Sequence, residues 1–201
     1  TYQVLTPTAA VGMLESIFWK PEIRYVIRRL IVLKPIRVMS MQRNMVQSKQ
    51  SPKVAKSWMQ SEGIGRYFAS EDRAQRNHLI LKDVAYLVDF HFELEPSTTE
   101  SQDKYSAQLK RRIDRGQCYR QPYFGCREYP AFFTWAKEGE TPHDELQGTT
   151  DLGMIPKHLH FIRDSKGKIQ FRDGATRQFV KGRVLPEMFH AQMIDGVIEV
   201  A

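Results

Sequence analysis

Cysteine is scarce in this sequence, and long apolar runs and metal-ligand spacings are missing. The two cysteines, Cys118 and Cys126, are too few for a disulfide framework, and their C-x7-C spacing is not typical of zinc ligands. No run approaches the roughly 20 apolar residues that a membrane-spanning helix needs. No signal peptide is visible either. We therefore expect a cytoplasmic protein that uses no metal or other cofactor, with both cysteines as ordinary packing thiols.

Acidic residues are nearly absent between Lys20 and Lys56. Ten cations stand there against one acid, Glu22, which gives +9 within a chain whose net charge is +7. A positive field of this kind favours polyanionic partners, namely RNA, DNA or an acidic membrane surface. Because the excess charge is confined to one segment, it suits a nucleic-acid surface better than general solubility.

The stretch from Gly116 to Phe133 combines glycine, arginine and tyrosine. Gly116 and Gly125 allow close approach of the backbone to a ligand. Arginine offers a planar donor fork that suits phosphate, and tyrosine offers a ring on which a base can stack. This composition favours a cradle for nucleic acid, although a tight turn that leads into a core strand has the same composition.

Two helices are predicted. Residues 6–20 have Thr6 as N-cap, a proline at the first helical position and an apolar stripe at helical spacing, and Pro21 should end the helix. Residues 103–115 place Tyr105, Leu109 and Ile113 on one face, and Gly116 follows as a suitable C′ residue.

Strands are predicted between and after these helices. The β-branched residues 23–38 and the alternating residues 78–94 read as two long strands, with residues 57–76 as a loop. An extension of a helix over residues 23–30 is the alternative. Residues 37–45 suggest a long basic hairpin that reaches out of the fold. Further strands are expected at 123–135, 157–163, 169–172, 178–185, 189–194 and 197–200, with hairpin turns at 164–167 and 195–196.

The order of the predicted helices and strands indicates an α+β fold. With one strand added before Thr1, the first part becomes a ferredoxin-like, RNA-recognition-like βαββαβ domain. We expect this domain, with its basic hairpin, over residues 1–136, and a small antiparallel β domain over residues 137–201. We also expect the first strand of the ferredoxin-like sheet to be missing, which would leave an open sheet edge.

Four pairs of motifs resemble the CRISPR-associated Cas5 family of the type I-C (Dvulg) subtype. They cover roughly the first two-thirds of the chain and are jointly specific. The C-terminal third resembles the family only in its general character and carries no matching motif. The matching residues are Thr6–Ala10 with Ile17–Pro21, Val32–Arg37 with Gln42–Asn44, Arg73–Asn77 with Leu81–Tyr86, and Arg115–Cys118 with Pro122–Glu128.

The resemblance implies a metal-independent endoribonuclease that cuts precursor CRISPR RNA at the base of a repeat hairpin. It also implies that the protein keeps the 5′ handle of the mature CRISPR RNA bound. The expected protein partners are the backbone and large subunits of the interference complex, which acts in antiviral defence.

Metal-free RNA cleavage uses the 2′-hydroxyl of the substrate as nucleophile, so it needs a base, a cation and an acid. In the resembled family these are a Tyr within Ile-Tyr-Trp-Lys-Pro and a Lys-His pair at the start of the second helix. Here the three positions are Phe18, Lys104 and Tyr105. Lys104 fits the phosphate-stabilising cation, helped by the positive end of its helix. Phe18 has no exchangeable proton, and Tyr105, whose ordinary pKa is near 10, is a poor base at neutral pH that otherwise anchors the apolar face of its helix.

The remaining candidates are RNA contacts and histidines. His158 and His160 point to one face of a strand, but two ligands do not make a metal site. The predicted RNA-binding residues lie in the basic hairpin, near both helices and in the glycine-rich loop. They are Lys20, Arg37, Arg43, Lys49, Arg111, Arg112, Arg120, Tyr123 and Arg127.

Two other functions are compatible with these residues. The first is a non-catalytic RNA-binding subunit that caps the 5′ handle, which the residues at positions 18 and 105 favour. The second is a protein that binds duplex DNA, which explains the charge but not the matched motifs.

Overall fold

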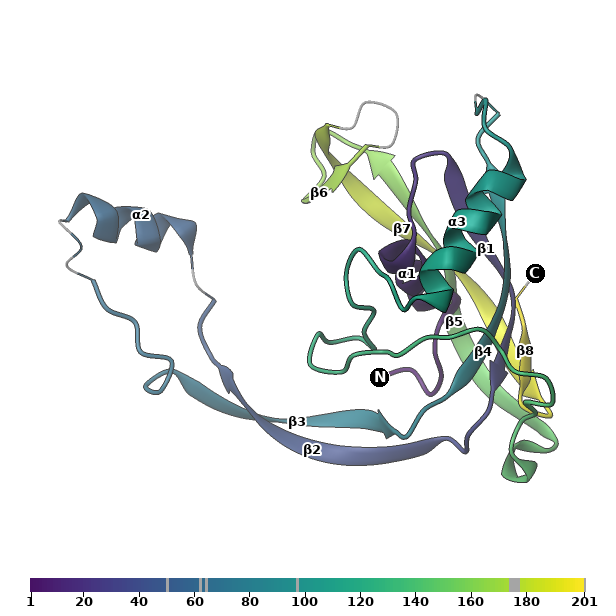
Figure 1. The fold of residues 1–201 in the computed structure, drawn as a ribbon. Coiled ribbons are helices and arrows are strands. Elements are labelled where there is room, and N and C mark those ends of the chain that lie inside the picture. The colour runs from purple at the N-terminus through teal and green to yellow at the C-terminus, as the bar shows by residue number, and fades with distance from the viewer. Residues whose placement is uncertain (50, 62, 64, 97, 174–177, 201) are drawn as a thin grey trace. The chain divides into compact units, whose positions relative to one another are not determined.

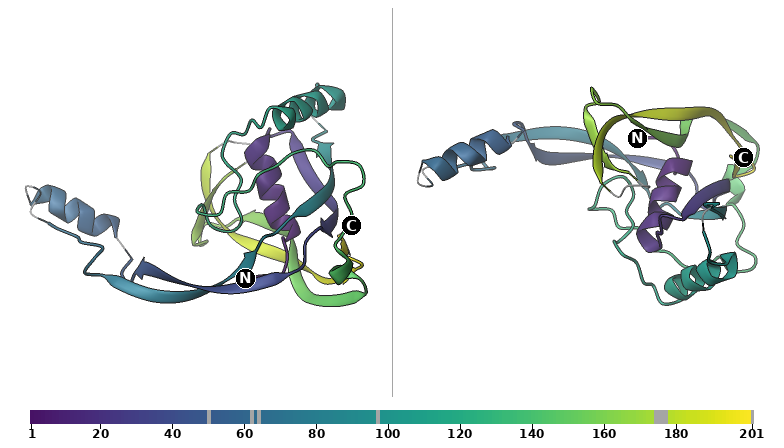
Figure 2. Two further views of the ribbon diagram at one scale, coloured as in Figure 1. Left: turned by 60° about the horizontal axis from the view of Figure 1, so that its bottom comes forward. Right: turned by 90° about the horizontal axis from the view of Figure 1, so that it is seen from above.

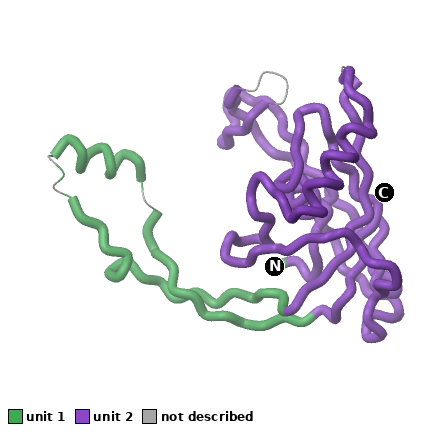
Figure 3. Tube along the Cα trace, in the orientation of Figure 1, with its two compact units in different colours: residues 1, 37–82 green, residues 2–36, 83–201 purple. Residues whose placement is uncertain are grey.

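The computed structural model describes residues 1–49, 51–61, 63, 65–96, 98–173 and 178–200. The chain forms two compact units, which Figure 3 distinguishes by colour. One, the ribbon unit, consists of residue 1 and residues 37–82. The other, the core unit, consists of residues 2–36 and 83–201.

A six-stranded antiparallel sheet organises the core unit (Figure 1). Its strand order is β4-β1-β8-β7-β5, and β6 pairs with β7 beside this path. The strands are β1 (Ile23–Val32), β4 (Tyr86–Leu94), β5 (Thr149–Arg163), β6 (Ile169–Arg172), β7 (Phe179–Ile194) and β8 (Val197–Glu199).

Helix α1 (Pro7–Ile17) packs against β1 and β5 and touches helix α3 (Gln102–Asp114), as the views in Figure 2 allow the reader to follow. The Thr6 hydroxyl caps α1 by accepting a hydrogen bond from the Ala9 amide at 3.3 Å. Both helices confirm the prediction, with ends shifted by a few residues. None of the helices in the described part of the chain is long and apolar enough to cross a membrane.

The core lies between the two helices and the sheet. Strand β1 alternates between buried and exposed side chains, so one of its faces supplies Ile23, Tyr25 and Ile27 to the interior. Helix α3 adds Leu109 and Ile113 from its apolar face. Helices and antiparallel strands together give the predicted α+β class, consistent with a ferredoxin-like domain and a β domain. The division after residue 136 stays a prediction, and β8 from its C-terminal side pairs with β1.

Two long predicted strands prove to be pairs of shorter ones. The stretch 23–38 divides into β1 and the beginning of β2, because Pro35 has no amide hydrogen for a ladder. The stretch 78–94 divides into the end of β3 and β4 at Asp83, which adopts a positive φ of 52°. A left-handed residue cannot continue a strand, so β3 ends before Asp83.

The predicted strand at 123–135 is wrong. These residues follow an irregular path with one isolated bridge between Tyr123 and Pro130. Gly125 has a positive φ of 72°, and Pro130 lacks a ladder donor, so the segment cannot extend as a strand.

Two of the C-terminal strands, β5 and β7, are longer than predicted, whereas β6 has the predicted bounds and β8 ends one residue earlier. Strand β7 is continuous where two strands were expected, and β5 begins at Thr149, upstream of the predicted start. The turn at 195–196 joins β7 to β8, which pair as a hairpin. The turn at 164–167 exists but joins β5 to β6, which both pair with β7, so it does not close the predicted hairpin.

The ribbon unit is built on two antiparallel strands, β2 (Arg37–Val46) and β3 (Arg73–Lys82), paired over ten rungs without a bulge. The predicted hairpin thus exists, and its second strand comes partly from residues that were predicted to be loop. Helix α2 (Pro52–Gln60) was not predicted. Its local signal is the pair Ser51-Pro52, where the serine hydroxyl accepts from the Lys53 amide and the proline occupies the first turn. Residues 62 and 64 of the predicted loop lie outside the described residues.

Candidate nucleic-acid interface

The end of helix α1 holds Phe18 inside the core. Phe18 leaves the helical conformation, with a φ of −145° and a ψ of 115°, and its side chain is 1% exposed. The hydroxyl of Tyr25 on β1 donates a hydrogen bond of 2.7 Å to the Phe18 carbonyl oxygen. The ring at position 18 is therefore a fixed part of the core, and a substrate cannot touch it in this conformation.

Tyr105 lies next to Phe18. The ring centroids are 6.4 Å apart, and Tyr105 is 5% exposed. Burial raises the pKa of the Tyr105 hydroxyl, the charges of Glu22 and Glu100 raise it further, and Lys104 opposes them. A raised pKa keeps the hydroxyl protonated at neutral pH, so Tyr105 cannot accept a proton from a substrate there.

Lys104 is exposed in the first turn of α3. Its backbone amide is capped by the Ser101 hydroxyl at 3.4 Å, and its ammonium group pairs with the Glu100 carboxylate at 2.5 Å. This pair is about half exposed, so it contributes little to stability and a phosphate can replace the carboxylate. The positive end of the helix dipole adds to the attraction for an anion.

Arg112 connects α3 to the end of α1. It donates a hydrogen bond of 2.7 Å to the Ile17 carbonyl oxygen, and its guanidinium carbon lies 5.2 Å from the Phe18 ring centroid. Arg112 was predicted to bind RNA, and this structural role within the core unit was not predicted. The neighbouring Arg111 is exposed on the same helix.

The glycine-rich loop is attached to α1 by its backbone. Gly116 has a positive φ of 60° after α3, and the amides of Tyr119 and Arg120 donate to the Ser16 carbonyl oxygen at 2.9 and 3.2 Å. Tyr119 is 85% exposed, and Phe132 is 91% exposed. Rings held on a fixed backbone but open to solvent are suited to base stacking.

The predicted contact residues in this loop differ in exposure. Arg120 and Arg127 are exposed, as is Lys20 after α1, whereas Tyr123 is half-buried. Tyr119, which was not among the predicted contacts, presents its ring to solvent more fully than Tyr123 does.

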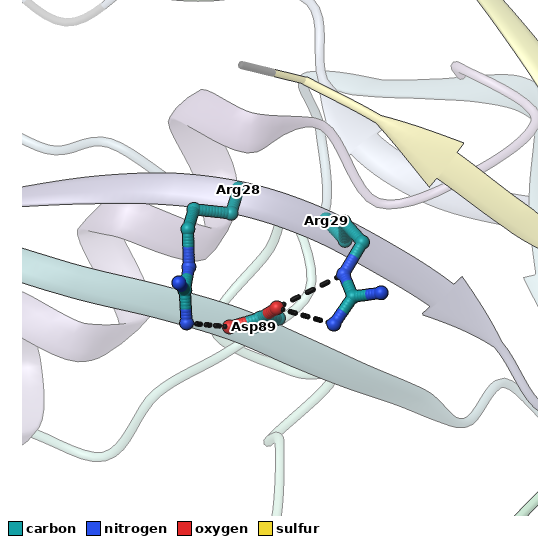
Figure 4. Close-up of polar contacts among 3 residues, drawn as sticks. All are labelled: Arg28, Arg29 and Asp89. Carbon is teal, nitrogen blue, oxygen red and sulfur yellow. Dashed lines mark hydrogen bonds and ion pairs between the residues drawn. The ribbon is translucent and has the colours of Figure 1, made fainter.

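Acids on and next to β4 neutralise part of the basic stretch 20–56. Asp89 accepts hydrogen bonds from Arg28 at 2.7 Å and from Arg29 at 2.9 and 2.8 Å (Figure 4). A bulge between Ile27 and Arg29 allows both consecutive arginines to reach it. The other ion pairs of this kind are Arg24 with Glu93 and Lys34 with Asp83. At least four of the ten cations are therefore paired, so the positive field of this segment is weaker than its composition predicts.

In the ribbon unit, cations oppose one another across the two strands. The register places Arg37 opposite Lys82 and Arg43 opposite Arg76. Positions 37 and 43 are six residues apart, so both pairs project from the same face of the ribbon. Like charges directly opposite are unfavourable, and an anion such as phosphate relieves the repulsion. Lys49, beyond the end of β2, is exposed.

Within the described residues, no group of three or more His, Cys, Asp or Glu side chains is arranged to hold a metal ion.

Comparison with known proteins decides the family. The family described as CRISPR-associated protein (Cas_Cas5) matches residues 1–201. The chain belongs to this Cas5 family. A CRISPR pre-crRNA endoribonuclease Cas5d of Thermus thermophilus is 39% identical over 201 residues, covering all of this chain and 81% of the relative. A protein of the same name from Mannheimia succiniciproducens is 34% identical over 208 residues, covering all of this chain and 84% of the relative.

Two solved structures share the fold of this chain. A functionally uncharacterized protein, SMU1763c from Streptococcus mutans, superimposes with a TM-score of 0.61 at 18% identity. A crystal structure of a CRISPR-associated protein superimposes with a TM-score of 0.58, also at 18% identity. Each comparison covers all of this chain and 81% of the other.

Proposed function

We propose that this chain is a metal-independent endoribonuclease that cuts the repeat hairpin of precursor CRISPR RNA in the cytoplasm. The single observation that carries the proposal is similarity over all of this chain, at 39% and 34% identity, to two proteins named CRISPR pre-crRNA endoribonuclease Cas5d. After cleavage the protein keeps the 5′ handle and joins the backbone and large subunits of the type I-C interference complex.

Lys104 is the catalytic cation in this proposal. Its ammonium group is exposed at the positive end of α3 and has only a weak, solvent-exposed partner in Glu100. Attack by the 2′-hydroxyl on the neighbouring phosphorus builds negative charge on the phosphorane oxygens. A cation placed there stabilises the transition state more than the ground state, which accelerates the reaction.

Phe18 and Tyr105 have supporting roles in the proposal. Phe18 has no proton-accepting atom, and the pKa of Tyr105 is raised by burial. Both rings are buried against each other and fix the start of α3, and through it Lys104. The general base therefore comes from another side chain.

RNA binding involves both units in this proposal. In the core unit the exposed cations near Lys104 and in the glycine-rich loop contact phosphates, while Tyr119 and Tyr123 offer rings to bases. In the ribbon unit the opposed cation pairs contact a further stretch of the backbone. The proposed phosphate contacts are Lys20, Arg37, Arg43, Lys49, Arg111, Arg112, Arg120 and Arg127.

A second candidate function is RNA binding without cleavage. It is favoured by the burial of both Phe18 and Tyr105, which removes two of the three predicted catalytic positions from contact with a substrate. In that case the protein caps the 5′ handle as a structural subunit. Binding to duplex DNA is compatible with the same basic surfaces, and competition between the two nucleic acids at one salt concentration separates them.

The deciding experiment incubates the protein with its repeat RNA hairpin in EDTA. Lys104→Ala is compared with Lys110→Ala, which removes an exposed lysine of the same helix. We expect one cut that leaves a 2′,3′-cyclic phosphate, slowed at least about 100-fold by Lys104→Ala alone. Tight binding with no cut by the unaltered protein would instead support the structural subunit.

A further inference from the structure

Two histidines and a glutamate form a cluster on strands β5 and β7. The rings of His158 and His160 meet edge to face with centroids 4.8 Å apart. The Nε2 atom of His160 lies 3.0 Å from a carboxylate oxygen of Glu187. In the strand register, Glu187 is directly opposite His158.

A β-bulge brings these side chains to one face of the sheet. The register of β5 with β7 shifts between Pro156 and His158, so Lys157 is the extra residue. Ile155, before the bulge, is buried against the core. Without the shift, positions 157 and 159 would continue the face of Ile155, but the bulge places His158 and His160 there. Bulges commonly re-aim side chains near functional sites.

The exposure of the three side chains is suited to contact with a substrate. His158 is partly buried, whereas the side chains of His160 and Glu187 are about half exposed. Arg183 lies on the same face, because it is four residues from Glu187 along β7. The face therefore combines proton-transferring groups with a cation that can bind phosphate.

The two imidazoles lie in different electrostatic environments. Burial lowers the pKa of His158, the neighbouring His160 and the cation Arg24 lower it further, and Glu187 opposes them. His160, in contrast, is about half exposed, and its Nε2 atom is hydrogen-bonded to the Glu187 carboxylate. Pairs of titratable groups whose environments differ in this way are suited to separate base and acid roles.

We propose that His158 and His160 are a general base and a general acid for cleavage of RNA phosphodiester bonds, with Glu187 orienting His160. Neutral His158 takes the proton of the 2′-hydroxyl, the 2′-oxygen attacks phosphorus, and the bond from phosphorus to the 5′-oxygen breaks. Protonated His160 gives its proton to the departing 5′-oxygen. The products are a 2′,3′-cyclic phosphate and a 5′-hydroxyl, and solvent exchange restores both rings.

This inference rests on the proposed binding of RNA by the same chain. It names the proton-transferring groups that Phe18 and buried Tyr105 do not provide. The substrate class is RNA with a 2′-hydroxyl, and no metal takes part in the step.

The test measures single-turnover cleavage of the repeat hairpin in EDTA between pH 5 and pH 9. The variants are His158→Ala, His160→Ala and Glu187→Gln. His190→Ala is the matched control, because His190 is an equally exposed β7 histidine paired with a carboxylate, that of Asp151, at 3.0 Å. Binding is measured in parallel with a repeat RNA that carries 2′-deoxyribose at the cut.

We expect His158→Ala and His160→Ala each to slow cleavage about 100-fold or more with less than about threefold change in RNA affinity. His158→Ala should remove the acidic limb of the pH profile and His160→Ala the alkaline limb. Glu187→Gln should slow cleavage less than either histidine variant while leaving RNA affinity unchanged, as expected for a positioning residue. His190→Ala should cleave like the unaltered protein.

Cleavage by both histidine variants at the rate of His190→Ala would overturn the inference. If Lys104→Ala abolished cleavage in the same experiment, the proposed endoribonuclease function would stand and the proposed histidine roles would not. Loss of cleavage in the histidine variants, with Lys104→Ala fully active, would support the histidine pair and refute the role of Lys104. Absence of any cut by the unaltered protein would overturn both the proposed endoribonuclease function and the proposed histidine roles.

Discussion

The guanidinium of Arg112 covers the ring of Phe18 and donates a hydrogen bond to the carbonyl oxygen of Ile17. The guanidinium carbon lies 5.2 Å from the centroid of the Phe18 ring, and the hydrogen bond to the Ile17 carbonyl oxygen is 2.7 Å long. One side chain thus joins the last turn of α3 to the end of α1. The carbonyl it satisfies lies at a helix end, where the backbone has no partner within the helix.

Arg112→Ala is expected to destabilise the protein by roughly 1–3 kcal/mol, from one hydrogen bond to a charged donor and one cation–π contact. Arg112→Lys should recover only part of this, because an ammonium group lacks the planar fork. Urea unfolding measures the effect. Arg111→Ala, which removes an exposed neighbour, should stay within about 0.5 kcal/mol of the unaltered protein. Equal stabilities of the Arg111 and Arg112 variants would contradict this role.

Asp89 should make stability depend on acidity. Partial burial favours the neutral acid, but the hydrogen bonds and charges of Arg29 and Arg28 outweigh it and lower the pKa of Asp89 below the ordinary 3.8. A lowered pKa in the folded state means that the ionised carboxylate stabilises the fold. This contribution is complete above the unfolded pKa and is lost as the pH falls through the folded pKa.

Asp89→Asn should therefore cost roughly 1 kcal/mol at pH 7, since both arginines are about half exposed. The difference from the unaltered protein should shrink as the pH falls below the ordinary 3.8 and through the lower folded-state pKa of Asp89. Urea unfolding at a series of pH values from about 7 to about 2.5 measures it. A difference that stays constant over this range would mean that the carboxylate charge is not the cause.

The opposed cations of the ribbon unit should affect stability and RNA binding in opposite directions. Arg76→Gln removes one member of the pair with Arg43, so it should relieve repulsion in the free protein and weaken RNA binding. The slope of log K against log salt concentration should fall by about 0.7 for each single-strand phosphate that the variant no longer neutralises. Filter binding at four salt concentrations measures the slope.

Arg24→Gln is the matched control for this prediction, because Arg24 lies opposite an acid, Glu93, in the strand register, whereas Arg76 lies opposite a cation. It should leave the salt slope nearly unchanged. If both variants lower the slope equally, the opposed pairs have no special role in binding phosphate.

Local chemistry in the sequence predicted those elements whose signals lie within a few residues. Thr6 and Pro7 mark the start of α1, Gly116 follows the end of α3, and Asp195-Gly196 forms the β7–β8 turn. The divisions between β1 and β2 and between β3 and β4 were missed, because the residues on both sides of each break have the same strand-like pattern. Pro35 was a local signal for the first break, whereas the positive φ of Asp83 at the second break is not evident from the sequence.

The candidate site was predictable in its residue types and not in its partners. Lys104 and the glycine-rich loop follow from motifs, but the pairing of Arg28 and Arg29 with Asp89 joins residues about sixty positions apart. This pairing also depends on a β-bulge that no local sequence pattern predicts. The same holds for His158 and Glu187, since a shift of one residue in register would place them on opposite faces.

Tyr119 should be a base-stacking residue. Its ring is 85% exposed, while its backbone amide is held by the Ser16 carbonyl oxygen at 2.9 Å, so the ring is presented to solvent from a fixed position. Tyr119→Ala is expected to weaken binding of the repeat RNA by about 1–3 kcal/mol, the usual value for one stacked base, with little change in protein stability. Tyr119→Phe keeps the ring and should bind like the unaltered protein. Fluorescence anisotropy with labelled repeat RNA measures the affinities, and thermal unfolding measures stability. Equal loss of affinity in both variants would show that the hydroxyl, and not the ring, makes the contact.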